Sequence, residues 1–404
     1  MKELTAIIQA CARQGDKMKS LATVVQTTGS SYRRPGARML VFPEGETVGS
    51  ISGGCLEQDV ILQAQKAMES GKNAVLSYDT TPEEDVVFGV GMGCKGVVQI
   101  LVECLPPRAG GPNDAVSFPG FVEDLFKHRQ TGAVATVVSV EGRTDVQVGN
   151  RLMLHQDGRI LSDVPDDILK SKMLSEAREA LGTGGQAMKR HEFAAGSAEV
   201  FAEVIHSPMP LVICGAGYDA QPMVRLAREL GFHVTVVDGR PAYASAARFP
   251  EADAVALAPV EGMPGELDLG ERTAAVIMSH NYLRDRNFLK ALLPKPLGYL
   301  GLMGPRKRAE QMLAELRTEG VAANESQLRA LHNPVGLDIG ADTPEQIALA
   351  ILAEIQAVMA GHAGGLLREK KGPIHAQSGT GLTGTAAGEP VSNRKGIACA
   401  ASVS

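Results

Sequence analysis

Residues 52–57 place a thiol, two glycines and a carboxylate in one short segment ahead of a predicted helix that runs to about residue 69. Cys55 follows Gly53 and Gly54 directly, and the dipole of a helix that begins at a cysteine favours its thiolate. A thiolate binds soft metals or accepts and transfers sulfur, and the glycines would let a bulky ligand approach the backbone. The alternatives are a buried structural cysteine and, for Glu57, a solvated charge in the first helical turn rather than a hydrogen-bonding partner of the site.

A second cysteine, Cys94, lies in the glycine-rich run 88–96. It could supply a further thiol, and Lys95 a cation for an anionic ligand, whereas a flexible turn is the equal alternative. The spacing from Cys55 matches no common zinc pattern and no histidine is close in sequence, so we predict no structural zinc.

Three arginines flank the turn that ends at Gly36. Arg33 and Arg34 could clamp a phosphate or carboxylate in bidentate fashion, or could simply be solvated. Arg38 has a counterpart, Arg151, in a repeat described below, and we expect it to be structural.

A different pattern begins at Leu211, where an apolar strand is followed by Gly215, Gly217 and Ala220 in the arrangement G-x-G-x-x-A. Such glycines allow a tight turn and let a phosphate approach a helix N-terminus. Asp238 closes the next strand, near the spacing expected of an acid that binds a ribose hydroxyl, and Arg240 could contact a phosphate or be solvated. A Rossmann turn that is glycine-rich for packing alone is the alternative.

Two later segments end strands of the same predicted sheet. His280 and Asn281 follow the strand near 274–278, and Arg306 opens a helix after the strand near 296–302. Ligands of open parallel sheets bind at the carboxyl ends of the strands, so these residues are site candidates. A structural histidine and a solvated basic helix start are the alternatives.

The elements that must position these residues include an internal repeat. Residues 22–25 recur at 135–138, and residues 36–40 resemble 149–153 at the same offset. Each copy predicts a helix, a strand, two further short strands, a longer helix and a later strand. The segment around Cys55 and the run around Cys94 have no equivalent in the second copy, so we expect the first copy to hold a site that the second supports.

We therefore expect an α/β protein with a duplicated α+β region followed by a Rossmann-like domain with a parallel sheet. Thr343 and Pro344 signal the start of its last helix. The expected limits are residues 1–106 for the first copy, 113–206 for the second, 208–361 for the Rossmann-like domain and 362–404 for a disordered tail.

The composition narrows the function. Apolar residues make up 44% and the net charge is −6, as in ordinary globular proteins, and this leaves no basic field for nucleic acid. No apolar run is long enough to span a membrane, and no signal peptide is evident, so we expect a cytoplasmic protein without membrane or nucleic-acid partners.

Taken in order, seven segments resemble the XdhC/CoxI family of maturation factors for xanthine dehydrogenase and related molybdenum hydroxylases. The resemblance covers nearly the whole chain, from about residue 4 to 360. The segments are 29–37 (GSSYRRPGA), 49–57 (GSISGGCLE), 215–217 (GAG), 237–240 (VDGR), 279–282 (SHNY), 304–308 (GPRKR) and 332–341 (HNPVGLDIGA).

This resemblance implies a chaperone that binds the molybdenum cofactor, molybdopterin, protects it while its sulfido ligand is installed, and delivers it to a hydroxylase. It implies a xanthine dehydrogenase-type hydroxylase and a cysteine desulfurase as partners, and it places Cys55 at the metal or the sulfur. Lys95 interrupts the family's usual G-C-G-G, which puts a shared role for Cys94 in question. We also expect a homodimer, with no catalytic turnover required.

We expect the Rossmann crevice to bind the pterin-phosphate or nucleotide part of the cofactor, while the loops of the first copy approach its metal. Two rival interpretations use the same fold. One is an NAD(P)-dependent oxidoreductase, and the other is a regulatory module that senses a nucleotide.

Overall fold

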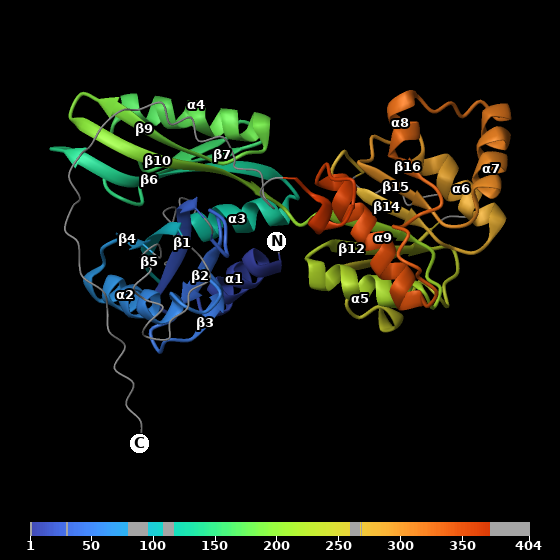
Figure 1. Ribbon diagram of the computed structural model, residues 1–404, viewed down its shortest axis with the longest axis horizontal. Helices are drawn as coiled ribbons and strands as arrows, with labels where there is room; N and C mark the ends of the chain where they lie inside the picture. The colour runs from blue at the N-terminus through green and yellow to red at the C-terminus, as the bar shows by residue number, and fades with distance from the viewer. Residues whose placement is uncertain are drawn as a thin grey trace, which may run out of the picture.

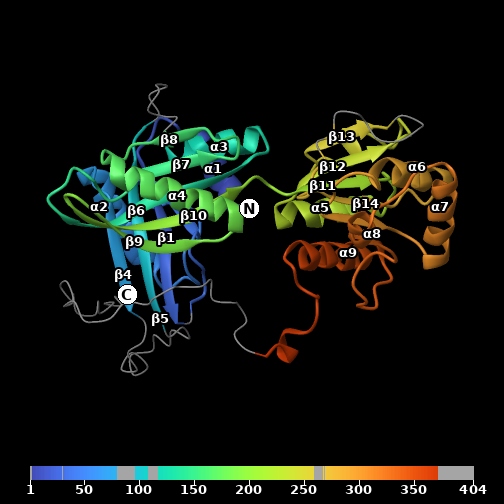
Figure 2. The ribbon, with the colours of Figure 1, turned by 90° about the horizontal axis from the view of Figure 1, so that it is seen from above.

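The computed structural model describes residues 2–29, 31–79, 96–107, 117–258, 267 and 269–371. These residues form two lobes that lie side by side in both views (Figures 1 and 2). The N-terminal lobe, up to residue 206, contains two five-stranded sheets, and the C-terminal lobe, from residue 210, contains a six-stranded sheet. No helix in the described ranges is both long and apolar enough to cross a membrane.

The first sheet is antiparallel and has the strand order β3-β2-β1-β5-β4. In chain order, its copy consists of α1 (Lys2–Arg13), β1 (Lys19–Gly29), β2 (Arg38–Val41), β3 (Thr47–Gly49), α2 (Glu57–Ser70), β4 (Ala74–Asp79) and β5 (Gly96–Leu105).

The second sheet repeats this topology with the order β8-β7-β6-β10-β9. A β-bulge interrupts each central pair at the same place, Val25 in β1 and Val138 in β6, which are 113 residues apart. The duplication expected from the sequence is thus confirmed. The second copy consists of α3 (Phe118–Lys127), β6 (Thr131–Gly142), β7 (Arg151–His155), β8 (Ile160–Ser162), α4 (Asp167–Thr183), β9 (Ala187–Phe193) and β10 (Gly196–His206).

The two copies stack with their sheets facing each other and with α2 and α4 on the outside (Figure 1). The bulged residues Val25 and Val138 pack with Leu101 and Phe201 between the sheets. Helices α1 and α3 fill the rest of the space, where Ile8, Phe121 and neighbouring side chains contact both sheets. One continuous interface therefore joins the copies.

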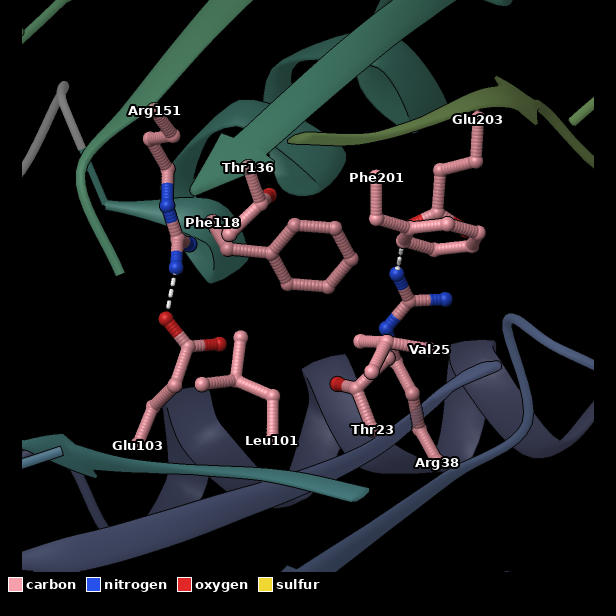
Figure 3. A pocket seen from close by; sticks show the side chains of 10 residues that line it. All are labelled: Thr23, Val25, Arg38, Leu101, Glu103, Phe118, Thr136, Arg151, Phe201 and Glu203. Atoms are coloured by element: carbon pink, nitrogen blue, oxygen red, sulfur yellow. Dashed lines mark hydrogen bonds and ion pairs between the residues drawn. The ribbon is translucent and has the colours of Figure 1, made fainter. Parts of the chain in front are cut away.

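Two buried ion pairs cross this interface in opposite directions, and both line a small pocket (Figure 3). Arg38 of the first copy contacts Glu203 of the second, and Arg151 of the second contacts Glu103 of the first. The ring of Phe118 lies 4.3 Å from the Arg38 guanidinium carbon. Burial raises the pKa of Glu103, while the guanidinium groups of Arg151 and Arg38 act in the other direction. The structural role expected of Arg38 is confirmed.

The C-terminal lobe contains a wholly parallel sheet of order β13-β12-β11-β14-β15-β16. This is the strand order 3-2-1-4-5-6 of dinucleotide-binding Rossmann folds, which confirms the expected fold class. The lobe consists of β11 (Pro210–Cys214), α5 (Ala220–Leu230), β12 (His233–Asp238), the 3₁₀ helix η3 (Ala246–Arg248), β13 (Ala254–Leu257), β14 (Ala274–Ile277), α6 (Tyr282–Leu292), β15 (Tyr299–Leu302), α7 (Arg306–Thr318), α8 (Glu325–Ala330), β16 (Leu331–His332), α9 (Pro344–Met359) and η4 (Leu367–Glu369).

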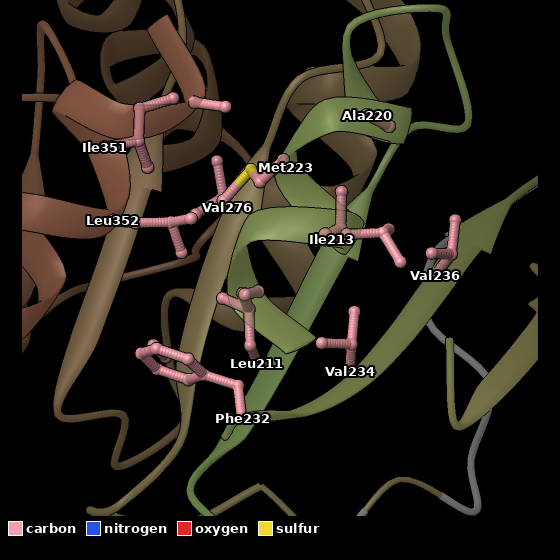
Figure 4. Packing of buried hydrophobic residues seen from close by; sticks show 14 of the residues in the cluster. Leu211, Ile213, Ala220, Met223, Phe232, Val234, Val236, Val276, Ile351 and Leu352 are labelled. Carbon is pink, nitrogen blue, oxygen red and sulfur yellow. The ribbon is translucent and has the colours of Figure 1, made fainter. Parts of the chain in front are cut away.

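Helices bury both faces of this sheet, which explains why its strands are continuously apolar. Met223 of α5 and Ile351 and Leu352 of α9 pack over the strands on one face (Figure 4). Helices α6 and α7 cover the other face. Thr343 caps α9 as expected, in a capping box with Gln346. The tail expected to be disordered from residue 362 contains the short 3₁₀ helix η4, and from residue 372 on it lies outside the described residues.

The lobes meet at the amino-terminal edge of the parallel sheet. Lys2 of α1 forms an ion pair with Glu229, near the C-terminus of α5, and the guanidinium of Arg129 lies 3.4 Å from His233, at the start of β12. The carboxyl ends of the strands, where Rossmann folds bind ligands, lie at the opposite edge of the sheet.

The reciprocal ion pairs predict a symmetric effect on stability. Because Glu203→Ala leaves the buried Arg38 guanidinium without its partner, it should lower the free energy of unfolding of the N-terminal lobe by about 3–5 kcal/mol. Glu103→Ala should cost a similar amount. Urea denaturation followed by far-ultraviolet circular dichroism measures both losses. Glu192→Ala, which removes one partner of an exposed ion pair, is the control, and its loss of unfolding free energy should be below about 1 kcal/mol. A loss of control size in either variant would contradict the structural role of the pairs.

Candidate functional site

The loop before α2 is braced by its own side chains. Glu57, the first residue of α2, turns back so that Oε1 accepts a hydrogen bond from the Ser52 backbone N–H at 2.8 Å. Its Oε2 accepts from the Ser52 hydroxyl and from the Leu56 N–H. The Ser52 hydroxyl oxygen in turn accepts from the N–H groups of Gly54 and Leu56. Glu57 therefore holds the loop in shape.

The charge of Glu57 is stabilised in this position. Burial raises the pKa of its carboxyl group, but the hydrogen bonds from Ser52 and from backbone N–H groups outweigh burial, and the pKa lies below its usual value. The brace is thus an ionised carboxylate at neutral pH.

Cys55 lies at the exposed tip of this braced loop. Its thiol is 3.7 Å from the Ser52 hydroxyl oxygen. Gly54 has a φ of +112° with open space where a Cβ would stand, so the backbone conformation, and not crowding, requires glycine there. The ring of Tyr32, itself 71% exposed, lies against Gly53. A thiol, two bare backbone positions and an aromatic ring thus share one surface, which we call the Cys55 surface.

Sequence reasoning missed Tyr32 as a member of this surface. A tyrosine in the polar turn between Gly29 and Gly36, in a chain with only 4% aromatic residues, was the available signal.

The two arginines expected near this surface have different surroundings. Arg33 forms an ion pair with Glu3 of α1, whose other carboxylate oxygen accepts a hydrogen bond from the Ser50 N–H at 2.7 Å. Arg33 therefore ties α1 to the loops. Arg34 is exposed and has no ion-pair partner within the described part of the chain. Cys94 and its glycine-rich run, apart from Gly96 at the start of β5, lie outside the described residues.

The second group of candidates lies at the carboxyl edge of the parallel sheet. Gly215 has a φ of +129°, and a Cβ there would come within 2.6 Å of the Met278 carbonyl oxygen, so the turn after β11 needs glycine on both counts. Gly217 follows in the same turn, next to Asp219 and His280.

Asp238, at the end of β12, has a different role from the one its position suggested. Its Oδ2 accepts hydrogen bonds from the Ala216 N–H at 2.8 Å and from the Arg240 guanidinium at 2.7 Å. Its Oδ1 accepts from the backbone N–H and the Nε of Arg240, both at 2.9 Å. The side chain is buried. With both oxygens occupied, Asp238 holds the glycine turn and Arg240 in place and presents no open acceptor to a ribose.

The candidate residues that follow β14 and β15 also differ in whether they already have a partner. The Asn281 side chain caps α6 by accepting a hydrogen bond from the Arg284 N–H. His280 is exposed, has a φ of +56°, and its Nε2 lies 2.5 Å from Asp219 Oδ2. Arg306 is exposed at the first position of α7. The structure therefore leaves Arg306 open to a ligand, whereas His280 is exposed but contacts Asp219, and Asn281 caps a helix.

Among the described residues, the two groups of candidates do not meet within one chain. No hydrogen bond or ion pair between described residues joins the Cys55 surface to the carboxyl edge of the sheet, and the lobes meet at the other edge. The described residues also contain no group of three or more histidine, cysteine or acidic side chains arranged to hold a metal ion.

Comparison with known proteins agrees with this architecture. Residues 211–355 match the model of the XdhC Rossmann domain. Residues 12–79 and 125–193 each match the model of the XdhC and CoxI family, and these stretches start 113 residues apart (125 − 12), the offset of the repeat. A Bacillus subtilis protein described as a probable subunit of xanthine dehydrogenase is 30% identical over 335 residues, which cover 83% of this chain and 91% of that protein.

This chain belongs to the XdhC and CoxI family. The molybdenum cofactor insertion chaperone PaoD of Escherichia coli is 24% identical over 339 residues, 84% of this chain and 82% of PaoD. A crystal structure of a xanthine dehydrogenase from Bacillus halodurans superposes with a TM-score of 0.69 at 25% identity, over 89% of this chain and 96% of that one. The family resemblance seen in the sequence is confirmed.

The role of Asp238 in this XdhC-type Rossmann domain predicts a pH-dependent stability. Burial raises the pKa of its carboxyl group, but the hydrogen bonds from Arg240 and Ala216 outweigh burial, and the pKa lies below its usual value. Its contribution should therefore be complete above about pH 4 and be lost as the pH falls through the lowered pKa. Asp238→Asn should cost about 2 kcal/mol of unfolding free energy at pH 7 and less below pH 4, as measured by urea denaturation. The exposed Asp342→Asn is the control, and an effect of Asp238→Asn as small as the control would refute this role.

Proposed function

We propose that this chain is a molybdenum cofactor chaperone that inserts the cofactor into a xanthine dehydrogenase-type molybdenum hydroxylase. The family and the names of its relatives support this proposal. The observation that carries it in this chain is Cys55, an exposed thiol on a braced glycine loop that only one of two copies has.

The contrast between the copies is local and specific. In the second copy, Asp166 caps α4 in the ordinary way, by accepting a hydrogen bond from the Leu169 N–H. The residue at the position of Cys55 is Ile168 (55 + 113). In the first copy, α2 has no side-chain cap at Leu56. Departures from an ordinary helix start are expected at functional positions, which supports a role for Cys55 in holding the cofactor's molybdenum or its sulfur.

The finer steps follow from the same surface. We propose that Cys55 contacts the metal end of molybdopterin, while Tyr32 and the bare backbone of Gly53 and Gly54 cover it from water. A chaperone that protects the cofactor during sulfuration would receive a cysteine desulfurase at this exposed loop. The cytoplasm is the compartment we propose for these encounters.

The Rossmann crevice is the proposed site for the pterin-phosphate or nucleotide part of the cofactor. Because the crevice opens at the sheet edge opposite the lobe boundary, the Cys55 surface of the same chain is not joined to it. A homodimer in which the crevice of one copy faces the Cys55 surface of the other would bring the two parts together, and we propose that arrangement.

The strand order of the parallel sheet also suits an NAD(P)-dependent oxidoreductase, or a module that senses a nucleotide. A chaperone and an oxidoreductase differ in the ligand that they retain. A chaperone retains molybdopterin and hands it on, whereas an oxidoreductase binds NADPH and turns over a substrate.

The chaperone function predicts a specific effect of one thiol. In a host that produces molybdopterin, Cys55→Ala should lower the cofactor retained, or transferred to an apo-hydroxylase, by about tenfold because a contact to the metal or its sulfur is lost. Cofactor content and the activity gained by the hydroxylase are the measurements.

Cys104→Ala is the matched control, since Cys104 is half-buried against the sulfur of Met18 and lies away from the loop. Equal effects of the two substitutions would remove Cys55 from the site. A wild-type protein that keeps no molybdopterin, yet reduces a substrate with NADPH, would refute the chaperone function itself.

A further inference from the structure

We propose that the corner formed by Arg240, Tyr243 and Arg248 beside the glycine turn binds a phosphate monoester of the ligand in the Rossmann crevice. This inference rests on the crevice being a ligand site, as proposed above. It adds the chemical class of the group recognised there and the residues that select it.

The acid at this position is not available to a sugar. In dinucleotide-binding sheets, an acid at the end of the second strand binds the ribose hydroxyls, whereas an arginine nearby accommodates a phosphate on that ribose. Here Asp238 is buried and accepts four hydrogen bonds, three from Arg240 and one from Ala216. The corner therefore presents guanidinium groups where a diol-binding protein presents a carboxylate.

Two guanidinium groups are arranged around one ring. The guanidinium carbons of Arg240 and Arg248 lie 3.7 Å and 4.6 Å from the ring centroid of Tyr243. Tyr243 is 37% exposed. Stacking on a ring holds a guanidinium group in a fixed plane while its N–H groups stay available for an anion. Two guanidinium groups against the single carboxylate of Asp238 leave one positive charge at the corner.

Both arginines keep donors in reserve. Arg240 uses Nε and Nη2 on Asp238, which leaves Nη1. Arg248 donates one long hydrogen bond of 3.3 Å from Nη2 to the Ala216 carbonyl oxygen, and its Nη1 has no hydrogen bond to a described residue. A planar fork with unused donors matches the oxygens of a phosphate.

The corner is attached directly to the glycine turn. Ala216 lies in the middle of that turn, between Gly215 and Gly217, and it donates its N–H to Asp238 and accepts from Arg248. A ligand whose first phosphate lies at the turn would therefore place a neighbouring group at the corner.

Two ligands carry a phosphate monoester that suits this corner. One is the terminal phosphate of molybdopterin, and the other is the 2′-phosphate of an NADP-type dinucleotide. The experiment compares each ligand with a form that lacks the phosphate. Molybdopterin is compared with molybdopterin treated with phosphatase, and NADPH is compared with NADH. Binding is measured by equilibrium titration of the full chain, for wild type and for Arg248→Ala.

In at least one of the two pairs, the ligand with the phosphate should bind at least about tenfold more tightly than the ligand without it. Arg248→Ala should abolish that preference. Arg225→Ala, at an exposed arginine of α5, is the matched control and should keep it. The melting temperatures of both variants show that the fold is kept.

The proposal is overturned if neither pair binds, if neither shows the preference, or if Arg248→Ala leaves the preference intact. A preference seen only for NADPH, with no binding of molybdopterin, would support the corner and refute the chaperone function. Molybdopterin that binds equally with and without its phosphate, together with no preference for NADPH over NADH, would support the chaperone function and refute the corner.

Discussion

The N-terminal lobe depends on two buried Arg–Glu pairs that cross between its copies. Each arginine finds its carboxylate only in the other copy, Arg38 in Glu203 and Arg151 in Glu103. Stacking the copies removes four charges from water, a cost of several kcal/mol that well-paired geometry offsets. The pairs therefore fix how the two sheets stack, and the apolar contacts of the bulged strands and of α1 and α3 follow from that register.

Because two ion pairs and the apolar contacts hold the copies together, the loops of the two copies can differ. Both copies keep the same strand order and the same bulge, yet only one replaces the ordinary helix start with the loop of Cys55. Glu57 then holds that loop through hydrogen bonds to Ser52 and Leu56. The second copy, with Asp166 and Ile168 at the corresponding place, supplies packing.

Local patterns in the sequence predicted most of the fold. The offset of 113 residues predicted the duplication, and the glycine turn with its flanking strands predicted the Rossmann sheet. Spacing could not identify Glu203 as the partner of Arg38, because that contact forms between elements far apart in sequence. Asp238 is occupied partly by a long-range contact, since Ala216 becomes its neighbour only when β11 and β12 pair. Its other partner, Arg240, is only two residues away, and the residue types alone did not show that the guanidinium turns back onto this carboxylate.

We propose that a duplicated scaffold presents one thiol loop and one crevice to the molybdenum cofactor. Mass spectrometry of the ligand that remains on the full chain, purified from a host that makes molybdopterin, tests this claim most directly. We expect molybdopterin, free or in a nucleotide form, bound in substantial amount. Protein that carries NADP(H) or no ligand at all, while the same host loads its own molybdenum enzymes, would contradict it.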